Sequence, residues 1–226
     1  RQVKPYKHVA ATQIALKVRV NWPVFCFLSS FMLLIEHFLK SLLSLTAMCN
    51  INNTVCTFFD FSSPESADYS LWSPVTDKVR GGNSTADIKD AIVDGMHLAS
   101  FEYNLVPLPN GACFAGVNYQ GQFNASGFDG VKINLKRTGV NEIFKVIFPQ
   151  EYSYEFAFKA PEEFKEIKFP FSGFLPYHWG KRVNTSRPLD TSHLGLAFQC
   201  FGGVYEDFKQ KGSGSLQIQW VKAYKD

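Results

Sequence analysis

Hydrophobic and polar side chains alternate over several short stretches of this sequence, which is typical of strands with one buried face. In residues 131–136 the apolar positions alternate with Lys132, Asn134 and Lys136. Comparable patterns predict strands at 57–61, 87–103, 142–148, 152–158, 164–171, 194–200 and 216–224. Asp94-Gly95 divides the second of these into a hairpin, because an Asp-Gly pair favours a tight turn.

The last predicted strand has the longest alternation. Its first set of alternating residues is Leu216, Ile218, Trp220, Lys222 and Tyr224. Its second set is Gln217, Gln219, Val221 and Ala223. Because side chains of a regular strand alternate between its faces, each set is expected to lie on one face.

Glycine and proline separate these strands and no long amphipathic helix is evident, so we predict an all-β, antiparallel β-sandwich. It forms a single domain at residues 50–226, preceded by an N-terminal apolar, helical extension at 1–49. Pro170 is expected to place its strand at a sheet edge or to place the end of the strand at a bulge, because proline donates no ladder hydrogen bond. Residues 172–191 are expected to form a long loop.

Residues 72–84 combine a tryptophan, an acid, two bases and a glycine pair. Gly81-Gly82 predicts a tight turn, because glycine adopts positive φ and allows close backbone approach. A buried Trp72 would hold one side of this turn, and Asp77 could accept hydrogen bonds from backbone amides that the turn leaves free. Arg80 is expected to be the side chain freest to meet a partner.

Residues 1–23 are basic and contain no acid, and an apolar run interrupted by Glu36, His37 and Lys40 occupies residues 24–47. Membrane association through residues 24–47 is one interpretation, although each charge near the centre of a span costs about 3 kcal/mol. A secretory signal or an organelle targeting segment is another. A third is that Met48 is the natural start and that the upstream residues are an imprecise gene-model extension, which would leave a cytosolic protein.

Composition excludes some function classes. The formal net charge of +3 and the lack of a basic stripe with interleaved aromatics argue against nucleic-acid binding. The 22 phenylalanines suit a β-rich interior. The five cysteines include no Cys-x-x-Cys pair, so no zinc ribbon is indicated. Cys49 and Cys56 could form a disulfide in an oxidising compartment, but buried or idle thiols are the preferred interpretation.

No catalytic motif is present: the sequence lacks a nucleophile elbow, a His-Glu-x-x-His pair, a P-loop and a dinucleotide fingerprint. We therefore expect no enzyme activity, no metal and no cofactor. Lys181, Arg182 and Arg187 with Trp179 form either a partner-binding patch or a solvated loop, and the solvated loop is preferred. Four Asn-x-Ser/Thr sequons, at Asn52, Asn83, Asn124 and Asn184, would matter only in the secretory pathway.

Several motifs in order resemble the complex I intermediate-associated protein 30 family. They begin with the aromatic strand 58–61 and continue with the Trp, Asp and Gly-Gly-x-Ser pattern of Trp72, Asp77, Gly81, Gly82 and Ser84. Phe128-Asp-Gly-Val131 then leads into the alternating strand at 132–136, and the Tyr-containing segment 152–154 follows. The Phe-Pro-Phe segment around Pro170, the Leu-Gly-Leu segment at 194–196 and the closing strand with Trp220 complete a resemblance that covers residues 57–224.

This resemblance implies a jelly-roll β-sandwich of the galactose-binding-like type. It also implies a non-catalytic, chaperone-like assembly factor for mitochondrial respiratory complex I, whose partners are assembly intermediates and other assembly factors. The place of the family-motif residues in this pattern favours a structural role for them. The possible partner contacts, which follow from residue type and not from the resemblance, are Arg80, Trp179, Lys181, Arg182 and Arg187. The alternative function is a secreted or lumenal carbohydrate-binding module.

Overall fold

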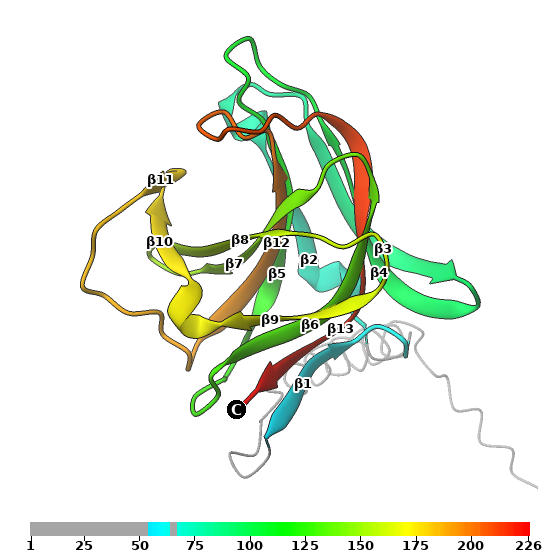
Figure 1. Cartoon of the computed structure of the whole chain (residues 1–226), viewed down its shortest axis with the longest axis vertical. Coiled ribbons are helices and arrows are strands. Elements are labelled where there is room, and N and C mark those ends of the chain that lie inside the picture. Colours follow the sequence, from blue (N-terminus) through cyan, green and yellow to red (C-terminus); the bar gives the residue numbers. More distant parts are fainter. Residues whose placement is uncertain (1–53, 64–66) are drawn as a thin grey trace, which may run out of the picture. The chain divides into compact units, whose positions relative to one another are not determined.

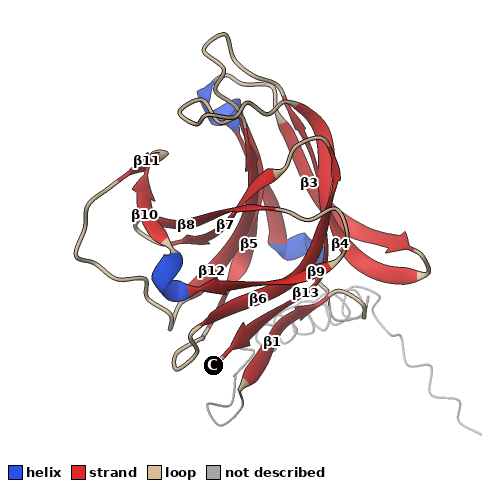
Figure 2. Cartoon of the chain, in the orientation of Figure 1, coloured by secondary structure: helices blue, strands red, loops and turns tan. Residues whose placement is uncertain are grey.

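Two antiparallel β-sheets account for most of the residues that the computed structural model describes, which are 54–63 and 67–226. All of them belong to a compact unit spanning Leu42–Asp226. The predicted all-β sandwich is therefore confirmed (Figure 1, Figure 2). The expectations for residues 1–49 lie outside the described residues, and the domain boundary near residue 50 stays a prediction. No helix within the described ranges is long and apolar enough to cross a membrane.

The first sheet has six strands, with the order β3-β4-β13-β6-β9 and with β1 paired to β13. The strands are β1 (Val55–Asp60), β3 (Thr85–Val93), β4 (Met96–Leu105), β6 (Gly130–Gly139), β9 (Lys165–Pro170) and β13 (Gly212–Tyr224). Strand β9 is an edge strand, which is one of the two positions expected from Pro170. The hairpin of β3 and β4 turns at Asp94-Gly95, where both residues have positive φ, as expected for this pair.

The second sheet has seven strands, in the order β11-β10-β8-β7-β12-β5-β2. The strands are β2 (Trp72–Thr76), β5 (Phe114–Phe123), β7 (Ile143–Pro149), β8 (Ser153–Lys159), β10 (Leu175–His178), β11 (Lys181–Arg182) and β12 (Leu194–Phe201). Three short 3-10 helices, η2 (Tyr69–Leu71), η3 (Asp77–Arg80) and η4 (Phe171–Gly173), connect the strands. The expected long loop at 172–191 is wrong in its first half, because β10 pairs with β8 and adds the hairpin of β10 and β11 to this sheet.

Strand β13 occupies the middle of the six-stranded sheet. Strand β6 pairs with β13 along nearly its whole length. Strand β4 pairs with residues 212–218 of β13, and β1 pairs with residues 220–224 of β13. The register of β13 against β6 shifts between Ile218 and Trp220, which marks a β-bulge. A one-residue shift exchanges the two faces, so Val221 and Ala223 continue the buried row and Trp220 does not. The prediction that Trp220 shares a face with Leu216 and Ile218 is therefore wrong.

Aromatic side chains fill the space between the sheets, in agreement with the high phenylalanine content. On the side of β1, Phe59 contacts Trp72 and Tyr119 at ring-centroid distances of 5.4 and 4.9 Å. On the side of β9, Phe158 of the seven-stranded sheet contacts Phe169 of the six-stranded sheet at 5.0 Å. Trp72 is 7% exposed, so its predicted burial is confirmed. Burying such side chains typically contributes about 1.5–3 kcal/mol each.

Asp77 is a buried acid at the start of η3, where the chain passes from β2 of one sheet to β3 of the other. Its carboxylate accepts hydrogen bonds from the Ser84 amide at 3.0 Å, the Ser84 hydroxyl at 2.6 Å and the Phe114 amide at 3.3 Å. Gly81 ends η3 with φ of +79°, and Gly82 lies against the carboxylate. The expected hydrogen bonds from Asp77 to backbone amides are thus present.

The two glycines of this turn are predicted to differ in their tolerance of alanine. A Cβ at Gly82 would lie 2.3 Å from Asp77 Cγ, so Gly82→Ala should displace the buried carboxylate and cost about 3 kcal/mol. A Cβ at Gly81 meets nothing within 4 Å, so Gly81→Ala should cost only the positive-φ penalty of about 1–2 kcal/mol. Denaturant unfolding of both variants measures the difference, and an equal loss of stability would contradict this account.

Candidate docking groove

A groove runs across the outer face of the seven-stranded sheet, on the side away from the core. It consists of two adjoining hollows of about 570 and 390 Å³ that share Arg80, Phe114, Lys145, Gly180 and Gln199. These shared residues come from η3, three sheet strands and the turn between β10 and β11. Figure 1 shows that η3, the 202–211 loop and the hairpin of β10 and β11 lie around the same end of this sheet.

Small and polar side chains form the floor of the groove. In one row of the sheet, Gly116 lies opposite Gln199, which lies opposite Lys145. In the next row, Asn118 lies opposite Ala197. Alternate residues of β5 and β12, such as Val117 and Phe198, point into the core, so this row of small side chains faces outward. Glycine and alanine at the centre of the face leave room that larger side chains would fill.

One wall of the groove is built around Lys145. Its ammonium lies 2.6 Å from the Glu155 carboxylate, and both side chains are largely buried. The same ammonium lies 5.2 Å from the centre of the Tyr177 ring and 4.3 Å from that of Phe201. Burial first, and then the Glu155 charge, raise the pKa of the Tyr177 hydroxyl, which therefore stays protonated at neutral pH. The wall therefore consists of the ion pair of Lys145 and Glu155 together with two aromatic rings that contact the ammonium.

The rim of the groove carries Trp179 in an unusual conformation. Trp179 and Gly180 form the two-residue turn of the β10–β11 hairpin, with φ of +54° and +77°. Positive φ at both positions fits a type I′ turn, which normally favours Asn, Asp or Gly at the position that Trp179 holds. Arg80 Nη2 donates a hydrogen bond to the Trp179 carbonyl at 3.3 Å, and the Trp179 residue is 78% exposed. Such strain is typical of functional positions.

The structure brings together four of the five residues that the sequence suggested as partner contacts. Arg80, Lys181 and Arg182 line the larger hollow, and Trp179 lines the smaller one. Arg187 lies apart, in a third hollow of about 700 Å³ with Tyr152 and His193, where it forms an ion pair with Glu151. No sequence motif identifies Lys145 and Glu155 as wall residues, because in the sequence they are simply polar positions of two predicted strands.

The family-motif residues do not line the groove. Asp77, Gly81, Gly82 and Ser84 form the turn beneath Arg80, and Trp72 lies in the core. Pro170 ends β9 at the edge of the other sheet, and Trp220 lies on the outer face of that sheet beside Lys222. Their positions support a structural role for the turn, which holds Arg80 at the groove, while the role of Pro170 and Trp220 in the family pattern stays a prediction.

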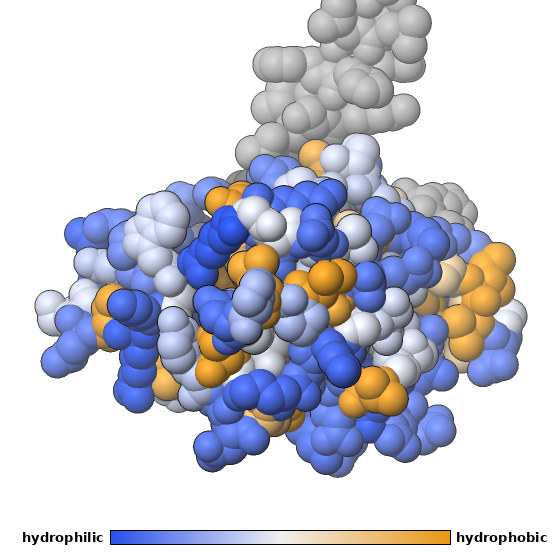
Figure 3. Space-filling view, turned by 90° about the horizontal axis from the view of Figure 1, so that it is seen from above, coloured by the Kyte–Doolittle hydropathy of each residue, from blue (hydrophilic) through white to orange (hydrophobic). Residues whose placement is uncertain are grey.

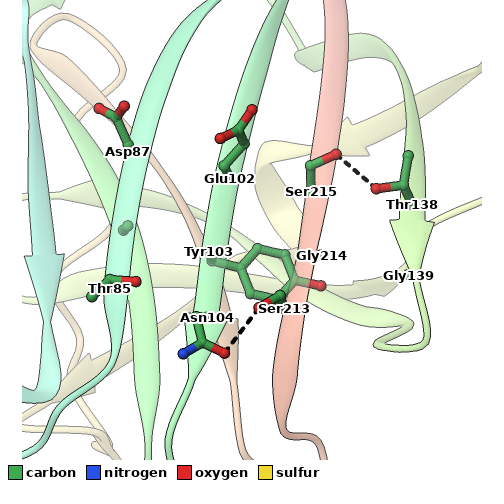
Figure 4. Close-up of a pocket in the computed structure, with 11 residues that line it drawn as sticks. Thr85, Asp87, Glu102, Tyr103, Asn104, Thr138, Gly139, Ser213, Gly214 and Ser215 are labelled. Carbon is green, nitrogen blue, oxygen red and sulfur yellow. Dashed lines mark hydrogen bonds between the residues drawn. The ribbon is translucent and has the colours of Figure 1, made fainter.

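A fourth hollow, of about 590 Å³, lies on the six-stranded sheet (Figure 4). Ser213 donates a hydrogen bond to Asn104 at 3.0 Å, and the hydroxyls of Thr138 and Ser215 lie 2.8 Å apart. Asp87 lies opposite Glu102, which forms an ion pair with Lys89 on β3. In the part of the chain that the structure describes, no group of three or more His, Cys, Asp or Glu residues could hold a metal. Most residues that line this hollow are polar, with Ala86, Tyr103 and two glycines among them.

The end of the sandwich seen from above in Figure 3 is largely hydrophilic, and its hydrophobic residues lie in separate small groups. Large apolar patches are typical of permanent interfaces, and this face shows none. Its mixed surface fits contacts in which aromatic and charged side chains are combined, and the groove has side chains of both kinds.

The cysteines offer no reactive thiol at the groove. Cys113 lines the larger hollow, but burial and then the Asp77 charge raise the pKa of its thiol. Burial raises the pKa of Cys200 to about 12. Both thiols are free and buried, as expected, whereas Cys56 is disulfide-bonded, so the preferred interpretation of idle thiols is wrong for Cys56. Protonated thiols are poor nucleophiles.

The two-sheet architecture is that of a β-sandwich, and solved structures with this architecture match it. The family 11 carbohydrate-binding module of the cellulosomal cellulase Lic26A-Cel5E of Clostridium thermocellum matches with a TM-score of 0.55 and 14% identity, over 76% of this chain and 95% of the module. The same organism's module in complex with a β-1,3-1,4-mixed-linked tetrasaccharide matches with a TM-score of 0.54 and 14% identity, over the same shares of the two chains. At this identity the likeness shows a shared fold.

The family of the chain follows from its sequence. Residues 59–218 match the family described as complex I intermediate-associated protein 30, and the chain belongs to that family. No curated protein sequence matches the chain. The resemblance inferred from residues 57–224 is therefore confirmed.

The raised pKa values predict that Cys113 and Cys200 resist thiol reagents in the folded protein. Because a raised pKa leaves the thiol protonated below that pKa, labelling should stay slow from pH 7 to pH 9 and become fast only after unfolding in denaturant. Peptide mapping after timed labelling locates each modified cysteine. Rapid labelling of Cys113 in the folded chain at pH 7 would mean that the thiol is accessible and ionised.

Proposed function

We propose that this protein is a non-catalytic assembly factor that assists respiratory complex I assembly through contacts with protein partners. Family membership over residues 59–218 is the observation that carries this proposal, because the family is defined by association with complex I intermediates. The groove supplies a surface suited to such contacts. It combines the cations Arg80 and Arg182 with the exposed ring of Trp179, and arginine and tryptophan are enriched at interface hot spots.

The chemistry of the groove supports a binding role over a catalytic one. Lys145, which lines both hollows, is already bound to Glu155, and Cys113 is held as a thiol by its raised pKa. A nucleophile is activated by a nearby base, by a lowered pKa or by a metal. Cys113 instead lies 3.9 Å from the carbonyl oxygen of Gln210, an acceptor that cannot take up a proton under ordinary conditions.

Carbohydrate binding is the second candidate, and Trp179 is the observation that favours it. An exposed aromatic ring beside a groove can stack on a sugar ring. The other two rings of the wall are less suited, because the Lys145 ammonium lies over both Tyr177 and Phe201. We therefore rank this function below partner binding.

We further propose that the protein works in mitochondria, as the family name suggests. The disulfide-bonded Cys56 favours an oxidising compartment, because structural disulfides persist where thiols are oxidised. The secretory pathway is therefore the main alternative, and a cytosolic protein that starts at Met48 is the least compatible with this disulfide.

Disruption of the gene is expected to lower the amount of assembled complex I and to change the pattern of its intermediates. The physical reason is that partly assembled subunits expose surfaces that the factor would otherwise hold. Native gels stained for complex I activity and probed for its subunits measure both effects. The matched control is re-expression of the full chain, which should restore the pattern. An unchanged amount of complex I and unchanged intermediates would refute the proposed function.

The location of the chain in the cell, followed with a tag at its C-terminus, tests the proposed compartment. The full chain should reach mitochondria and resist a glycan-removing enzyme in gel mobility, whereas a version started at Met48 should lose its targeting. Fluorescence microscopy with compartment markers, together with gel mobility, measures this. A mobility change after the glycan-removing enzyme would place the chain in the secretory pathway and contradict the mitochondrial assignment.

A further inference from the structure

We propose that the groove on the seven-stranded sheet binds an extended acidic segment of a partner protein. This inference rests on the proposed function and specifies the chemistry of the partner. It follows from three independent features of the groove: its charge, an unsatisfied acceptor on its floor, and the strained tryptophan at its rim.

The rim has a surplus of positive charge. Arg80, Lys181 and Arg182 line the larger hollow, and Glu206 is the acid that lines it beside them. Deeper in the groove, Lys145 and Glu155 cancel each other in their ion pair. Arg80 packs its guanidinium 5.9 Å from the centre of the Phe114 ring, which leaves its orientation restricted. Ordered guanidinium groups favour bidentate contact with carboxylates, so the rim selects a ligand with acidic side chains.

The floor offers hydrogen-bonding groups that suit a peptide backbone. Asn118 Oδ1 is buried and has no hydrogen-bond partner among the described residues, although it lines the smaller hollow. A buried acceptor without a partner is costly, so a rotation of the Asn118 side chain that lets it accept a hydrogen bond from a ligand backbone N–H would be favourable. Gln199 also lines this hollow and lies opposite Gly116, in the row of the sheet next to that of Asn118. The small side chains of Gly116 and Ala197 leave space for an extended chain above these amides.

Trp179 supplies the apolar part of the interaction. Its ring is exposed at the rim, and the turn that carries it is held in place by Arg80 through the Trp179 carbonyl. A type I′ turn would be more stable with asparagine or glycine at this position, so the tryptophan is not explained by the hairpin itself. Packing of its ring on an apolar side chain of the ligand would bury surface that is exposed in the free protein.

These features favour a peptide over a neutral sugar. The ammonium of Lys145 lies over the rings of Tyr177 and Phe201, which limits the flat aromatic surface on which a sugar could stack. A neutral sugar would also leave the positive charge of Arg80, Lys181 and Arg182 without a counter-charge. An acidic peptide satisfies the cations, the floor amides and the tryptophan together.

The test uses the full chain and a short fluorescein-labelled peptide of alternating glutamate and leucine. Fluorescence anisotropy should detect binding that weakens as salt is added, because exposed charges are screened. Arg182→Gln should weaken binding roughly tenfold, and adding Arg80→Gln should weaken it roughly tenfold more, as expected for charge-assisted hydrogen bonds. The Trp179→Phe variant should lose the change in tryptophan emission that accompanies binding to the original chain.

Arg187→Gln is the matched control, because it removes the same charge from a different hollow. It should leave the affinity unchanged, and thermal unfolding should show that every variant compared is folded. The single variant Arg182→Gln keeps the test valid if loss of Arg80 disturbs the Trp179 turn, since Arg182 is exposed in a two-residue strand. A peptide with lysine in place of glutamate should not bind.

Three results would overturn the proposal. Equal weakening by Arg187→Gln and Arg182→Gln would show a non-specific effect of net charge. Failure of the acidic peptide to bind, with binding of a mixed-linked β-glucan oligosaccharide that changes the emission of Trp179, would assign the groove to carbohydrate. If neither the acidic peptide nor the oligosaccharide binds, the proposal that the groove binds an acidic segment is wrong. Complex I levels after gene disruption are read separately, so loss of this inference and loss of the proposed function can be told apart.

Discussion

The hydrogen bonds of the buried Asp77 carboxylate hold together the part of the molecule on which the groove depends. They join η3 to the Ser84 amide just before β3 and to the Phe114 amide at the start of β5. The Ser84 hydroxyl, itself bound to Asp77, also accepts a hydrogen bond from the Val106 amide after β4. One carboxylate thus connects the ends of strands from both sheets. A buried charge is stable only with such partners, so this corner of the sandwich has little freedom to rearrange.

The position of Arg80 follows from that corner. Arg80 follows Asp77 by three positions in a single turn of 3-10 helix, and Gly81 ends the helix by adopting positive φ. The side chain of Arg80 therefore leaves the turn at a defined place, where it reaches Phe114 and the carbonyl of Trp179. Within this stretch Asp77, Gly81 and Ser84 form the turn, whereas Arg80 lines the groove. A motif without catalytic chemistry can therefore still determine where a groove-lining side chain is held.

Much of the fold could be predicted from local sequence. The strand pattern, the Asp94-Gly95 hairpin, the edge position of Pro170 and the burial of Trp72 each follow from side-chain alternation or from the backbone limits of glycine and proline. The bulge after Ile218 could not be predicted, because an inserted residue leaves the alternation of residue types intact while exchanging the faces. The hairpin of β10 and β11 was also missed, since its four- and two-residue strands are too short for a period-two pattern.

The sequence by itself determined the family, the all-β architecture and the composition of the turn at 72–84, because these depend on residues close together in the chain. Only the tertiary structure decided the site. Arg80 and Trp179 are 99 residues apart, and Lys145 reaches Tyr177 and Phe201 from a different strand. Nothing in their local sequence distinguishes Arg182, which lines the groove, from Arg187, which does not. Strand order and register make that distinction, since they determine which outward-facing positions become neighbours on the sheet.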